Sequence, residues 1–522
     1  MRQDDQDQAA PRAMPDDAVA IVGAGPGGLA AARWLLAHGM EPVLFEAADA
    51  PGGQWNPAAP GSGTWPGMCT NTSRVMTAFS DLDHPDGTAT CPSREEMQAY
   101  LQHYAGLHGI AARVRCRTRV AGLEPATGGG WLLRTEGPDG PQAWRFARVI
   151  VASGRHAVPE IPAIPGLDGF TGRHGAIHAA AYDGPERYRG ATIVTAGCSI
   201  SALEIASDLA LNRVRVVASY RRQRYVLPKL NAGLPTDHVL FNRAAALAAE
   251  RLPPAALEGG LKTAVLRAGG DPAPYGAPAA DPSIFAAGIA QAQHFLPCVA
   301  EGRIAVKPWI AAVEGSEIRF TDGSTVTADG LLFGTGYRLD LPWLAPRVRD
   351  RLAPDGWHLD LCDFTFHPDL PVLAFLGLYE MAGPYLPVLE LQARWIAYAF
   401  AGLRPAPTEA GLRDGVARAR AARSGPPVLP MHDMALLFAR RAGVEPELDR
   451  WPALERALLF GPLSPASFRL QGPDSLAEAP DRARAAAAAF GGEAENRFTP
   501  EEEGLRGLLH GNPAAEARGS AA

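Results

Sequence analysis

The stretch AVAIVGAGPGGLAAARWLLAHGMEPVLFEAA, residues 18–48, decides the fold of this chain. Its apolar start, 18–25, ends in glycine and is typical of a buried parallel strand. A segment with helical periodicity follows over 29–39, and a second strand is predicted over 42–48. Strand, helix and strand within about 30 residues make one βαβ unit, which predicts an α/β domain of the Rossmann type.

The glycines of GAGPGG, residues 23–28, stand where a dinucleotide-binding turn requires them. The first allows a tight strand-to-helix turn, the second lets the backbone approach a pyrophosphate, and the third permits close helix packing. The helix start then offers N–H groups and the positive end of its dipole to the anion. An acid at the end of the next strand can bind ribose hydroxyls. The predicted cofactor-binding residues are Gly23, Gly25, Pro26, Gly27, Gly28 and Glu46.

A second βαβ unit of the same type begins about 170 residues further along the chain. Its strands are predicted over 191–197 and 213–220, with a helix over 201–211 between them. Another buried strand is predicted over 147–154, and the regularly spaced prolines of 156–166 favour an extended connection between domains. Two such units predict two dinucleotide-binding domains.

The second turn differs from the first in its residues and in the charge that follows it. Serine and alanine stand at the second and third glycine positions, and two arginines replace the acid. A carboxylate would repel a 2′-phosphate, whereas a guanidinium binds it with two hydrogen bonds. The contrast predicts FAD in the first site and NADPH in the second, with solvated arginines at a strand end as the alternative. The residues predicted to bind NADPH are Gly197, Ser199, Ser201, Ala202, Arg221 and Arg222.

The composition excludes several classes of protein. The 522 residues are 47% hydrophobic and 20% charged, with a net charge of −7, which suits a folded chain of two or three domains. No apolar run reaches the roughly 20 residues of a membrane span, and no basic tract is long enough to follow a nucleic acid. The acidic N-terminus does not resemble a signal peptide, so we expect a cytoplasmic protein without membrane or nucleic-acid partners.

The sequence lacks the residues that several other kinds of active site require. The six cysteines are scattered without a CxxC pair, which argues against a redox cysteine pair beside a flavin and against a zinc site. No GxSxG or HExxH motif is present. His174 and His178 lie four residues apart without an obvious third ligand, so we predict no metal site.

These observations divide the chain into segments. Residues 244–300, rich in Ala, Pro and Gly, are expected to form an irregular, partly helical insertion, and 387–403 a largely buried helix. The NADPH domain is expected to interrupt the FAD domain. The predicted order is a disordered tail over 1–16, the first part of the FAD domain over 17–188, the NADPH domain over 189–333, the second part of the FAD domain over 334–440, and a helical C-terminal extension with a tail over 441–522.

A series of short strings runs along the chain in a fixed order: GAGPGG (23–28), GGQW (52–55), TNTSRVMTAFSD (70–81), the set Phe170, Gly172, His178 and Tyr182, GCSISA (197–202), FGTGY (333–337) and ELQARW (390–395). In these strings and their order, the chain resembles the flavin-containing monooxygenase family, a group of class B flavoprotein monooxygenases, over roughly residues 18–410. Two features depart from the family: five residues separate Gly172 from His178 where the family normally has three, and the second glycine motif is degenerate.

The resemblance implies a reaction cycle and a set of residues beside the flavin. NADPH reduces the flavin, O₂ adds at C4a to give a hydroperoxide, and a nucleophilic nitrogen or sulfur atom takes the distal oxygen. It places Asn71 at the catalytic position, where a neutral amide can hydrogen-bond near N5 and C4a without adding negative charge. A turn residue that satisfies local backbone is the alternative for Asn71. Gln54 and Trp55 are expected along the flavin, or else in a plain loop with a buried indole.

The same resemblance leaves other functions open. The related Baeyer–Villiger enzymes are similar around WPGMCTN (65–71), but usually carry aspartate where Asn71 stands and tryptophan where Tyr182 stands. Both differences favour oxygenation of a small nitrogen or sulfur compound with O₂. The alternatives are a Baeyer–Villiger monooxygenase acting on a ketone, and a non-oxygenating NADPH oxidase or redox-responsive flavoprotein. Substrate identity is set by loops that these motifs do not describe, and a homodimer is one option for the assembly.

Overall fold

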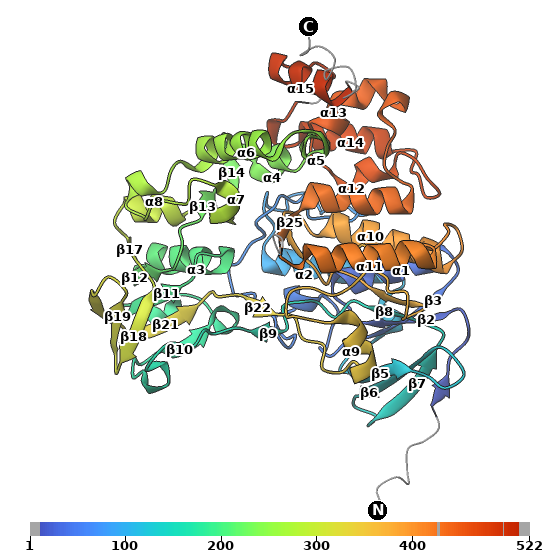
Figure 1. Cartoon of the computed structure of the whole chain (residues 1–522), viewed down its shortest axis with the longest axis horizontal. Helices are drawn as coiled ribbons and strands as arrows, with labels where there is room; N and C mark the ends of the chain where they lie inside the picture. The colour runs from blue at the N-terminus through green and yellow to red at the C-terminus, as the bar shows by residue number, and fades with distance from the viewer. Residues whose placement is uncertain (1–10, 425–427, 494, 511–522) are drawn as a thin grey trace, which may run out of the picture.

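Two five-stranded parallel sheets organise the chain, which the computed structural model describes over residues 11–424, 428–493 and 495–510. They lie side by side in Figure 1, with the second sheet on the left in green and yellow. In spatial order the first sheet consists of β23 (Leu373–Phe375), β8 (Arg148–Val151), β2 (Ala18–Val22), β3 (Glu41–Phe45) and β4 (Val114–Arg115). The second consists of β10 (Gly175–His178), β21 (Gly330–Phe333), β11 (Thr192–Ala196), β12 (Arg215–Ser219) and β17 (Ile304–Lys307).

The βαβ unit predicted over 18–48 is present. All five residues of β2 are buried, between the parallel partners β3 and β8. Helix α1 (Pro26–Ala37) begins at Pro26 rather than at residue 29, because proline is favoured in the first helical turn. It packs against α10 (Leu386–Phe400), which confirms the buried helix expected over 387–403.

The second βαβ unit is also present. Strand β11 pairs with β12 on one side and β21 on the other, and α3 (Ile200–Leu211) connects β11 to β12. The edge strand β10 belongs to this sheet, so the second sheet takes a strand from before residue 189, where the NADPH domain was expected to begin. The connections between the sheets run together, since β9 (Val158–Pro159) pairs antiparallel with β22 (Tyr337–Arg338).

Two smaller sheets cover the parallel ones. One consists of β1 (Arg12–Ala13), β7 (Gln142–Phe146), β6 (Trp131–Glu136) and β5 (Arg119–Pro125). The other consists of β18 (Ile310–Glu314), β19 (Glu317–Phe320) and β20 (Thr325–Thr327).

The N-terminal tail was expected to extend to residue 16, but Arg12–Ala13 form strand β1, which pairs with β7. Residues 1–10 and 511–522, where tails were also expected, lie outside the described residues.

The insertion over 244–300, which was expected to be irregular and partly helical, is mostly helical. Alanine has the highest helix propensity, and Asn242 caps the first of these helices by accepting from the Ala245 N–H. Pro253 and Pro254 precede or begin the next helix, where proline does not interrupt it. The insertion contains α5 (Arg243–Arg251), α6 (Pro254–Gly269), α7 (Ile284–Ala287), α8 (Phe295–Ala300) and β16 (Ile289–Gln291), which pairs with β13 (Tyr225–Leu227).

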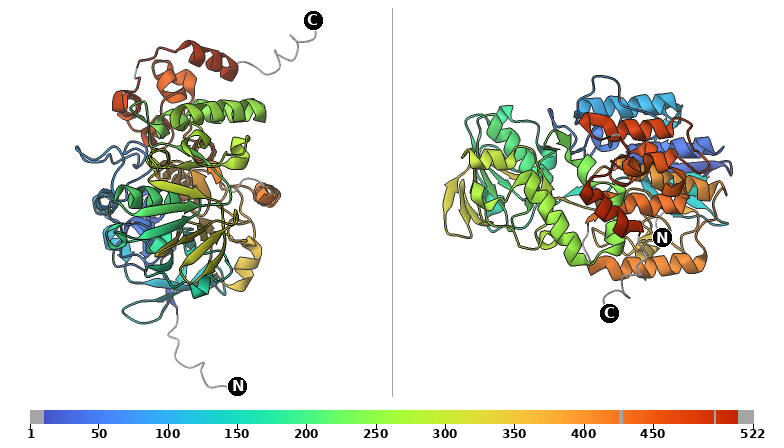
Figure 2. Two further views of the ribbon diagram at one scale, coloured as in Figure 1. Left: turned by 90° about the vertical axis from the view of Figure 1, so that its left-hand side faces the viewer. Right: turned by 90° about the horizontal axis from the view of Figure 1, so that it is seen from above.

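The C-terminal extension is helical, as expected, and its helices pack on the insertion. Figures 1 and 2 show the red helices of the extension beside the green helices of the insertion. Ala244 and Ala248 of α5 form one apolar cluster with Leu459 and Leu509 of the extension. The helices of this region are α12 (Met431–Ala442), α13 (Glu455–Leu459), α14 (Ala479–Ala488) and α15 (Pro500–His510).

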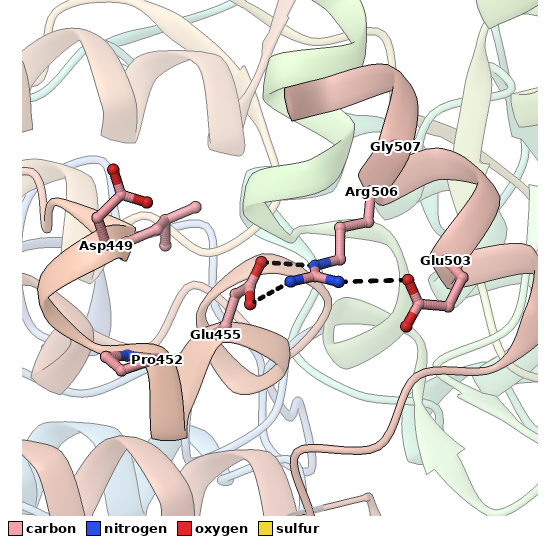
Figure 3. A pocket seen from close by; sticks show the side chains of 7 residues that line it. Asp449, Pro452, Glu455, Glu503, Arg506 and Gly507 are labelled. Carbon is pink, nitrogen blue, oxygen red and sulfur yellow. Dashed lines mark hydrogen bonds and ion pairs between the residues drawn. The ribbon is translucent and has the colours of Figure 1, made fainter. Parts of the chain in front are cut away.

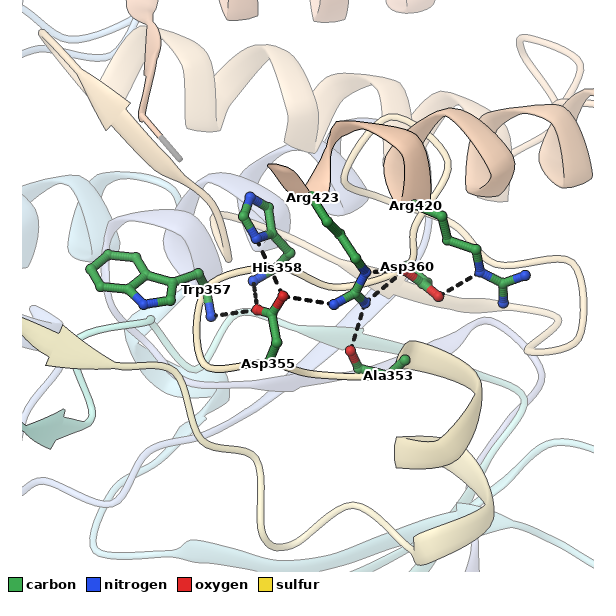
Figure 4. Close-up of polar contacts among 7 residues, drawn as sticks. All are labelled: Ala353, Asp355, Trp357, His358, Asp360, Arg420 and Arg423. Atoms are coloured by element: carbon green, nitrogen blue, oxygen red, sulfur yellow. Dashed lines mark hydrogen bonds and ion pairs between the residues drawn. The ribbon is translucent and has the colours of Figure 1, made fainter. Parts of the chain in front are cut away.

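Polar clusters fasten the outer helices. Arg506 of α15 makes two hydrogen bonds to Glu455 of α13, 2.6 and 2.8 Å long, and contacts Glu503 at 3.3 Å (Figure 3). In the first domain, Arg423, which follows α11 (Glu409–Ala421), hydrogen-bonds the buried carboxylate of Asp360 (Figure 4). The remaining elements are α2 (Arg94–Leu107), α4 (Thr236–Leu240), α9 (Pro346–Leu352), α11 (Glu409–Ala421), β14 (Leu230–Asn231), β15 (Leu234–Pro235), β24 (Glu380–Ala382) and β25 (Val428–Pro430).

No helix within the described residues is both long enough and apolar enough to span a membrane. Within the described residues, four apolar clusters hold the parallel sheets. The largest lies between the first sheet and α1, α2, α10 and α12, and a second lies between the first sheet and the sheet of β5–β7. A third surrounds α3 in the second domain, and a fourth lies between the second sheet and the sheet of β18–β20. Each sheet is therefore built around its own core.

The two strand-to-helix turns depend on close contact between backbones. Gly23 has a φ of +99°, and a Cβ there would lie 2.6 Å from the carbonyl oxygen of Ala152. Gly197 has a φ of +122°, and its Cβ would lie 2.5 Å from the oxygen of Gly334. Only glycine adopts such backbone angles without strain. Both turns therefore require glycine for conformation and for space.

We expect Gly23→Ala to destabilise the fold much more than Gly39→Ala. Gly39 also has a positive φ, +73°, but nothing lies within 4 Å of a Cβ built there. Strain and overlap should lower the free energy of unfolding by about 3 kcal/mol at Gly23, against about 1 kcal/mol for strain alone at Gly39. Urea unfolding of both variants measures the difference. Equal losses would mean that the turn accommodates a side chain.

Candidate functional site

The first turn leaves the start of α1 open to an anion. Gly25 is the N-cap residue, no side chain caps the helix, and no acid stands in its first turn. By contrast, α2 carries a complete capping box of Ser93 and Glu96. A Cβ on Gly25 would lie 3.3 Å from the Cα of Gly53, so the 52–55 loop closes directly on the turn. A Cβ on Gly28 would lie 2.0 Å from the Gly23 oxygen, which explains the third glycine.

Glu46 lies beside this turn and is held by it. One carboxylate oxygen accepts a 2.8 Å hydrogen bond from the Ala24 N–H, and the other accepts one of 2.8 Å from the Ala48 N–H. The side chain is buried, with 8% of the residue exposed. A carboxylate has about four acceptor sites, so these bonds leave capacity for ribose hydroxyls. The residue therefore also serves the turn itself, which the sequence analysis did not predict.

The second turn has the same architecture with different residues. The Gly197 N–H donates to Ser219 at 2.9 Å, as the Gly23 N–H does to Phe45. Ser199 is the N-cap residue of α3, but its hydroxyl donates to the Gly334 oxygen at 2.7 Å and caps no N–H group. Ala202 packs so closely that a Cβ on Gly334 would lie 2.6 Å from it. Ser201 lies in the first turn of α3, and no acidic residue stands in that turn.

The two arginines after β12 are exposed at the end of this strand. The guanidinium carbon of Arg221 lies 4.7 Å from the ring centre of Trp309. A phosphate contact requires such exposure, and a solvated strand end would show it as well. The structure thus places Arg221 and Arg222 where the sequence predicts them, and their role stays a prediction.

A continuous segment, 52–73, runs from the first turn to the second domain. At its start, Trp55 is buried in the first core, while Gln54 is exposed and its carbonyl accepts from the Ser62 hydroxyl at 2.8 Å. Further along, Trp65 packs in the core of the second domain, with its ring 5.7 Å from that of Tyr182. The segment therefore lies at the seam between the two domains.

Asn71 lies on this segment and is half-buried. The Thr70 hydroxyl donates to the Thr72 carbonyl at 2.7 Å, and the Thr70 N–H donates to Pro92 at 2.8 Å. Within the part of the chain that the structure describes, the Asn71 side chain makes no hydrogen bond of its own. The neighbouring threonine, not Asn71, satisfies the local backbone, so the amide is available to a ligand.

An ion pair that the sequence analysis missed lies near the first turn. Arg155 follows β8, is 4% exposed, and approaches Glu380 at 2.9 Å. Its guanidinium carbon lies 5.1 Å from the ring centre of Trp357, which Figure 4 shows on the loop before β23. Burial alone would raise the pKa of Glu380, but His156 and Arg155 outweigh burial and lower it. The sequence contained one indication of this ion pair, because Arg155 directly follows a predicted buried strand that ends in glycine.

Contacts within the second domain are made by four residues of one family string: Phe170, Gly172, His178 and Tyr182. A Cβ on Gly172 would lie 2.7 Å from the Asp329 oxygen. His178 Nε2 lies 2.9 Å from the Gly336 oxygen, in the connection between domains, and the Tyr182 hydroxyl donates to Asp208 at 2.7 Å. Strand β10 occupies most of the spacing between Gly172 and His178 and ends at His178. These contacts give the set a structural role.

Two surface pockets of the structure lie away from the turns. One lies in the C-terminal extension between α13 and α15 (Figure 3), and the other lies where β11 and β12 begin. Ligands of parallel α/β sheets bind at the carboxyl ends of the strands, so we assign the site to the turns. Among the described residues, no group of three or more His, Cys, Asp or Glu could hold a metal ion.

Comparison with known proteins finds relatives along almost the whole chain. Flavin-containing monooxygenase 5 of Rattus norvegicus is 27% identical over 493 residues, which cover 88% of this chain and 90% of the relative. The structure of S-allyl-L-cysteine S-oxygenase from Allium sativum is 21% identical, with a TM-score of 0.61, over 96% of this chain and 98% of the other. Cyclohexanone monooxygenase with bound cyclohexanone is 16% identical, with a TM-score of 0.63, over 83% and 98%.

The structural likenesses confirm the fold, which consists of two Rossmann-like domains with an α-helical extension. The family model described as FMO-like, flavin-binding monooxygenase-like, matches residues 16–486. With the two glycine turns and the seam segment in the places described, the chain belongs to this family of flavin-dependent oxidoreductases.

Proposed function

We propose that the protein is an FAD- and NADPH-dependent monooxygenase that oxygenates a nucleophilic nitrogen or sulfur atom of a small molecule. One observation supports the proposal: segment 52–73 closes on the first glycine turn, packs Trp65 in the core of the second domain, and carries Asn71. Two dinucleotides bound at these turns would meet at the seam.

The first turn suits FAD. Its open helix start would hold the pyrophosphate, and Glu46 would accept hydrogen bonds from ribose hydroxyls. Gln54 and Trp55 belong to the 52–55 loop that closes on Gly25, and would lie along the flavin. Bound FAD supplies hydride acceptance and activation of O₂, while the chain binds it, orients it and excludes water.

The second turn suits NADPH. The start of α3 carries no acid that would repel a pyrophosphate, and Ser199 has turned its hydroxyl toward Gly334. Arg221 and Arg222 would hold the 2′-phosphate with charge-assisted hydrogen bonds. They are the residues that would distinguish NADPH from NADH.

Asn71 would act at the seam without changing charge. Its amide can donate and accept hydrogen bonds but does not titrate, so it adds no negative charge near the reacting oxygen. That favours transfer to an electron-rich nitrogen or sulfur atom. The S-oxygenase from Allium sativum, which is similar to this chain over most of its length, acts on a sulfur compound by its name.

The main test is anaerobic reduction of the FAD-loaded protein with NADPH or NADH, followed by mixing with O₂. We expect NADPH to reduce the protein faster, and O₂ to produce a long-lived absorbance distinct from oxidised and reduced flavin. An amine or sulfide should then consume this absorbance and yield an N- or S-oxide. The oxygenated product per NADPH consumed is measured by mass spectrometry.

Other outcomes assign the protein differently. Esters formed from ketones, without activity on amines or sulfides, would identify a Baeyer–Villiger monooxygenase. Immediate return to oxidised flavin, with one peroxide released per NADPH whatever compound is offered, would identify an oxidase and refute the proposal.

We expect Arg221→Ala to raise the KM for NADPH by about tenfold and to leave the KM for NADH within about twofold, because only NADPH carries the 2′-phosphate. Arg215→Ala is the matched control, since Arg215 is an exposed arginine at the opposite end of the same strand. Steady-state kinetics with both coenzymes measure the effect. If Arg221→Ala changes both KM values equally, the phosphate contact is wrong.

A further inference from the structure

We propose that Asp237 and Lys229 are positioning residues that fix Asn71 by holding segment 69–73 at its two ends. Both residues belong to the second domain's part of the chain, between β13 and α5, whereas Asn71 belongs to the first. The proposal rests on the function proposed above for Asn71. Nothing in the sequence pattern links these positions, which are separated by about 160 residues.

Asp237 holds the far end of the segment. One of its oxygens accepts two hydrogen bonds from Ser73, from the N–H at 2.7 Å and from the hydroxyl at 2.9 Å. His238 Nε2 lies 3.1 Å from the same hydroxyl. Asp237 is 1% exposed and Ser73 is fully buried, so water does not compete for these bonds. Burial raises the pKa of Asp237 to about 6, which leaves it ionised at neutral pH.

Lys229 holds the near end. Its ammonium lies 3.2 Å from a carboxylate oxygen of Glu204 and donates to the Cys69 sulfur at 3.4 Å. Burial alone would lower the pKa of Lys229, but Glu204 and Cys69 outweigh burial and raise it, so the ammonium stays charged. Because Glu204 belongs to α3, this end of the segment is tied to the helix that starts at the second glycine turn.

The two ends are held by one rigid unit. Strands β14 and β15 form the short hairpin between Lys229 and Asp237. Thr236 closes it, because its N–H donates to the Lys229 oxygen at 2.9 Å and its hydroxyl donates to Pro228 at 2.7 Å. Gln293 fixes the hairpin to the insertion by accepting a hydrogen bond from the Lys229 N–H at 2.8 Å.

The C-terminal extension covers the same contacts. The ring of Phe490 lies 5.2 Å from that of His238, edge to face, and the guanidinium carbon of Arg74 lies 4.7 Å from the Phe490 ring centre. Three parts of the chain therefore converge on a stretch of five residues. The only half-buried amide in that stretch is Asn71, which makes no hydrogen bond within the described residues.

Contacts that only stabilised the fold would not need to hold the chain on both sides of one residue, as the contacts of Lys229 and Asp237 do on either side of Asn71. Ser80, seven residues beyond the segment, offers a comparison, because it also donates its N–H and hydroxyl to a buried carboxylate, that of Glu390 on α10. That contact lies within the first domain and outside segment 69–73. If only stability matters, loss of either serine hydroxyl should have the same consequences. If positioning matters, only the contact with Asp237 should affect the reaction.

The test compares Asp237→Ala, Asp237→Asn, Ser73→Ala and Lys229→Met with the control Ser80→Ala in the full-length, FAD-loaded protein. The first readout is hydrogen–deuterium exchange of peptides covering 69–77, which needs no turnover. We expect exchange there to be about tenfold faster in Asp237→Ala, because a buried N–H loses a charged acceptor. Asp237→Asn should stay near the parent, since its amide oxygen can accept the same bonds.

The second readout is the lifetime of the absorbance formed with O₂ after NADPH reduction. We expect it to fall about tenfold in Asp237→Ala and in the same direction in Ser73→Ala and Lys229→Met. Ser80→Ala should leave it unchanged even where thermal melting shows a comparable loss of stability. Should Asp237→Ala not fold, Ser73→Ala and Lys229→Met provide the same comparison with smaller changes.

The outcomes separate this inference from the function on which it rests. A parent protein that forms no long-lived absorbance refutes the proposed function, and the positioning role with it. A parent that forms it, with a lifetime that Asp237→Ala, Ser73→Ala and Lys229→Met leave unchanged, refutes only the positioning role. Equal shortening by Ser73→Ala and Ser80→Ala would also refute it, because stability alone would then explain both.

Discussion

The structure depends on the approach of two backbones at each strand-to-helix turn. At the first turn Gly23 lies against the Ala152 carbonyl, and at the second Gly197 lies against that of Gly334. No side chain fits in either contact, so the helix that follows starts directly at the carboxyl edge of its sheet. Its first N–H groups and the positive end of its dipole then point to the place where a pyrophosphate would bind. Fold and cofactor chemistry thus follow from the same steric constraint.

Sequence patterns predicted the parts of the fold that are local along the chain. Strand, helix and strand of each βαβ unit lie within about 30 residues, and their periodicity and glycines indicate the elements directly. The edge strand β10 was not predicted, and the insertion, expected to be irregular and partly helical, is more helical than expected. β10 joins its sheet only through β21, which follows it by more than 150 residues. In the insertion, prolines at helix starts were mistaken for signs of irregular structure.

The candidate site shows the same limit. The glycines, Glu46 and the arginines were predicted from local patterns, while Asn71 came from resemblance to a family. Neither route could identify Asp237, because its contact with Ser73 spans 164 positions and aspartate in a helix has no special signature. Long-range polar contacts of this kind depend on how two domains pack, and one sequence does not encode that packing in any local pattern.

The contrast of charges between the two turns needs a different interpretation once the contacts are known. Glu46 accepts hydrogen bonds from Ala24 and Ala48 and is largely buried, so an acid is useful there for the turn, whatever ligand is bound. Within the described residues, Arg221 and Arg222 make no hydrogen bond to the second turn; both are exposed, and the first stacks on Trp309. Most arginines are exposed, so this exposure permits a phosphate contact without showing one. The prediction of NADPH therefore rests on the charge at the second turn alone, because the acid of the first turn contributes to the fold whatever ligand is bound.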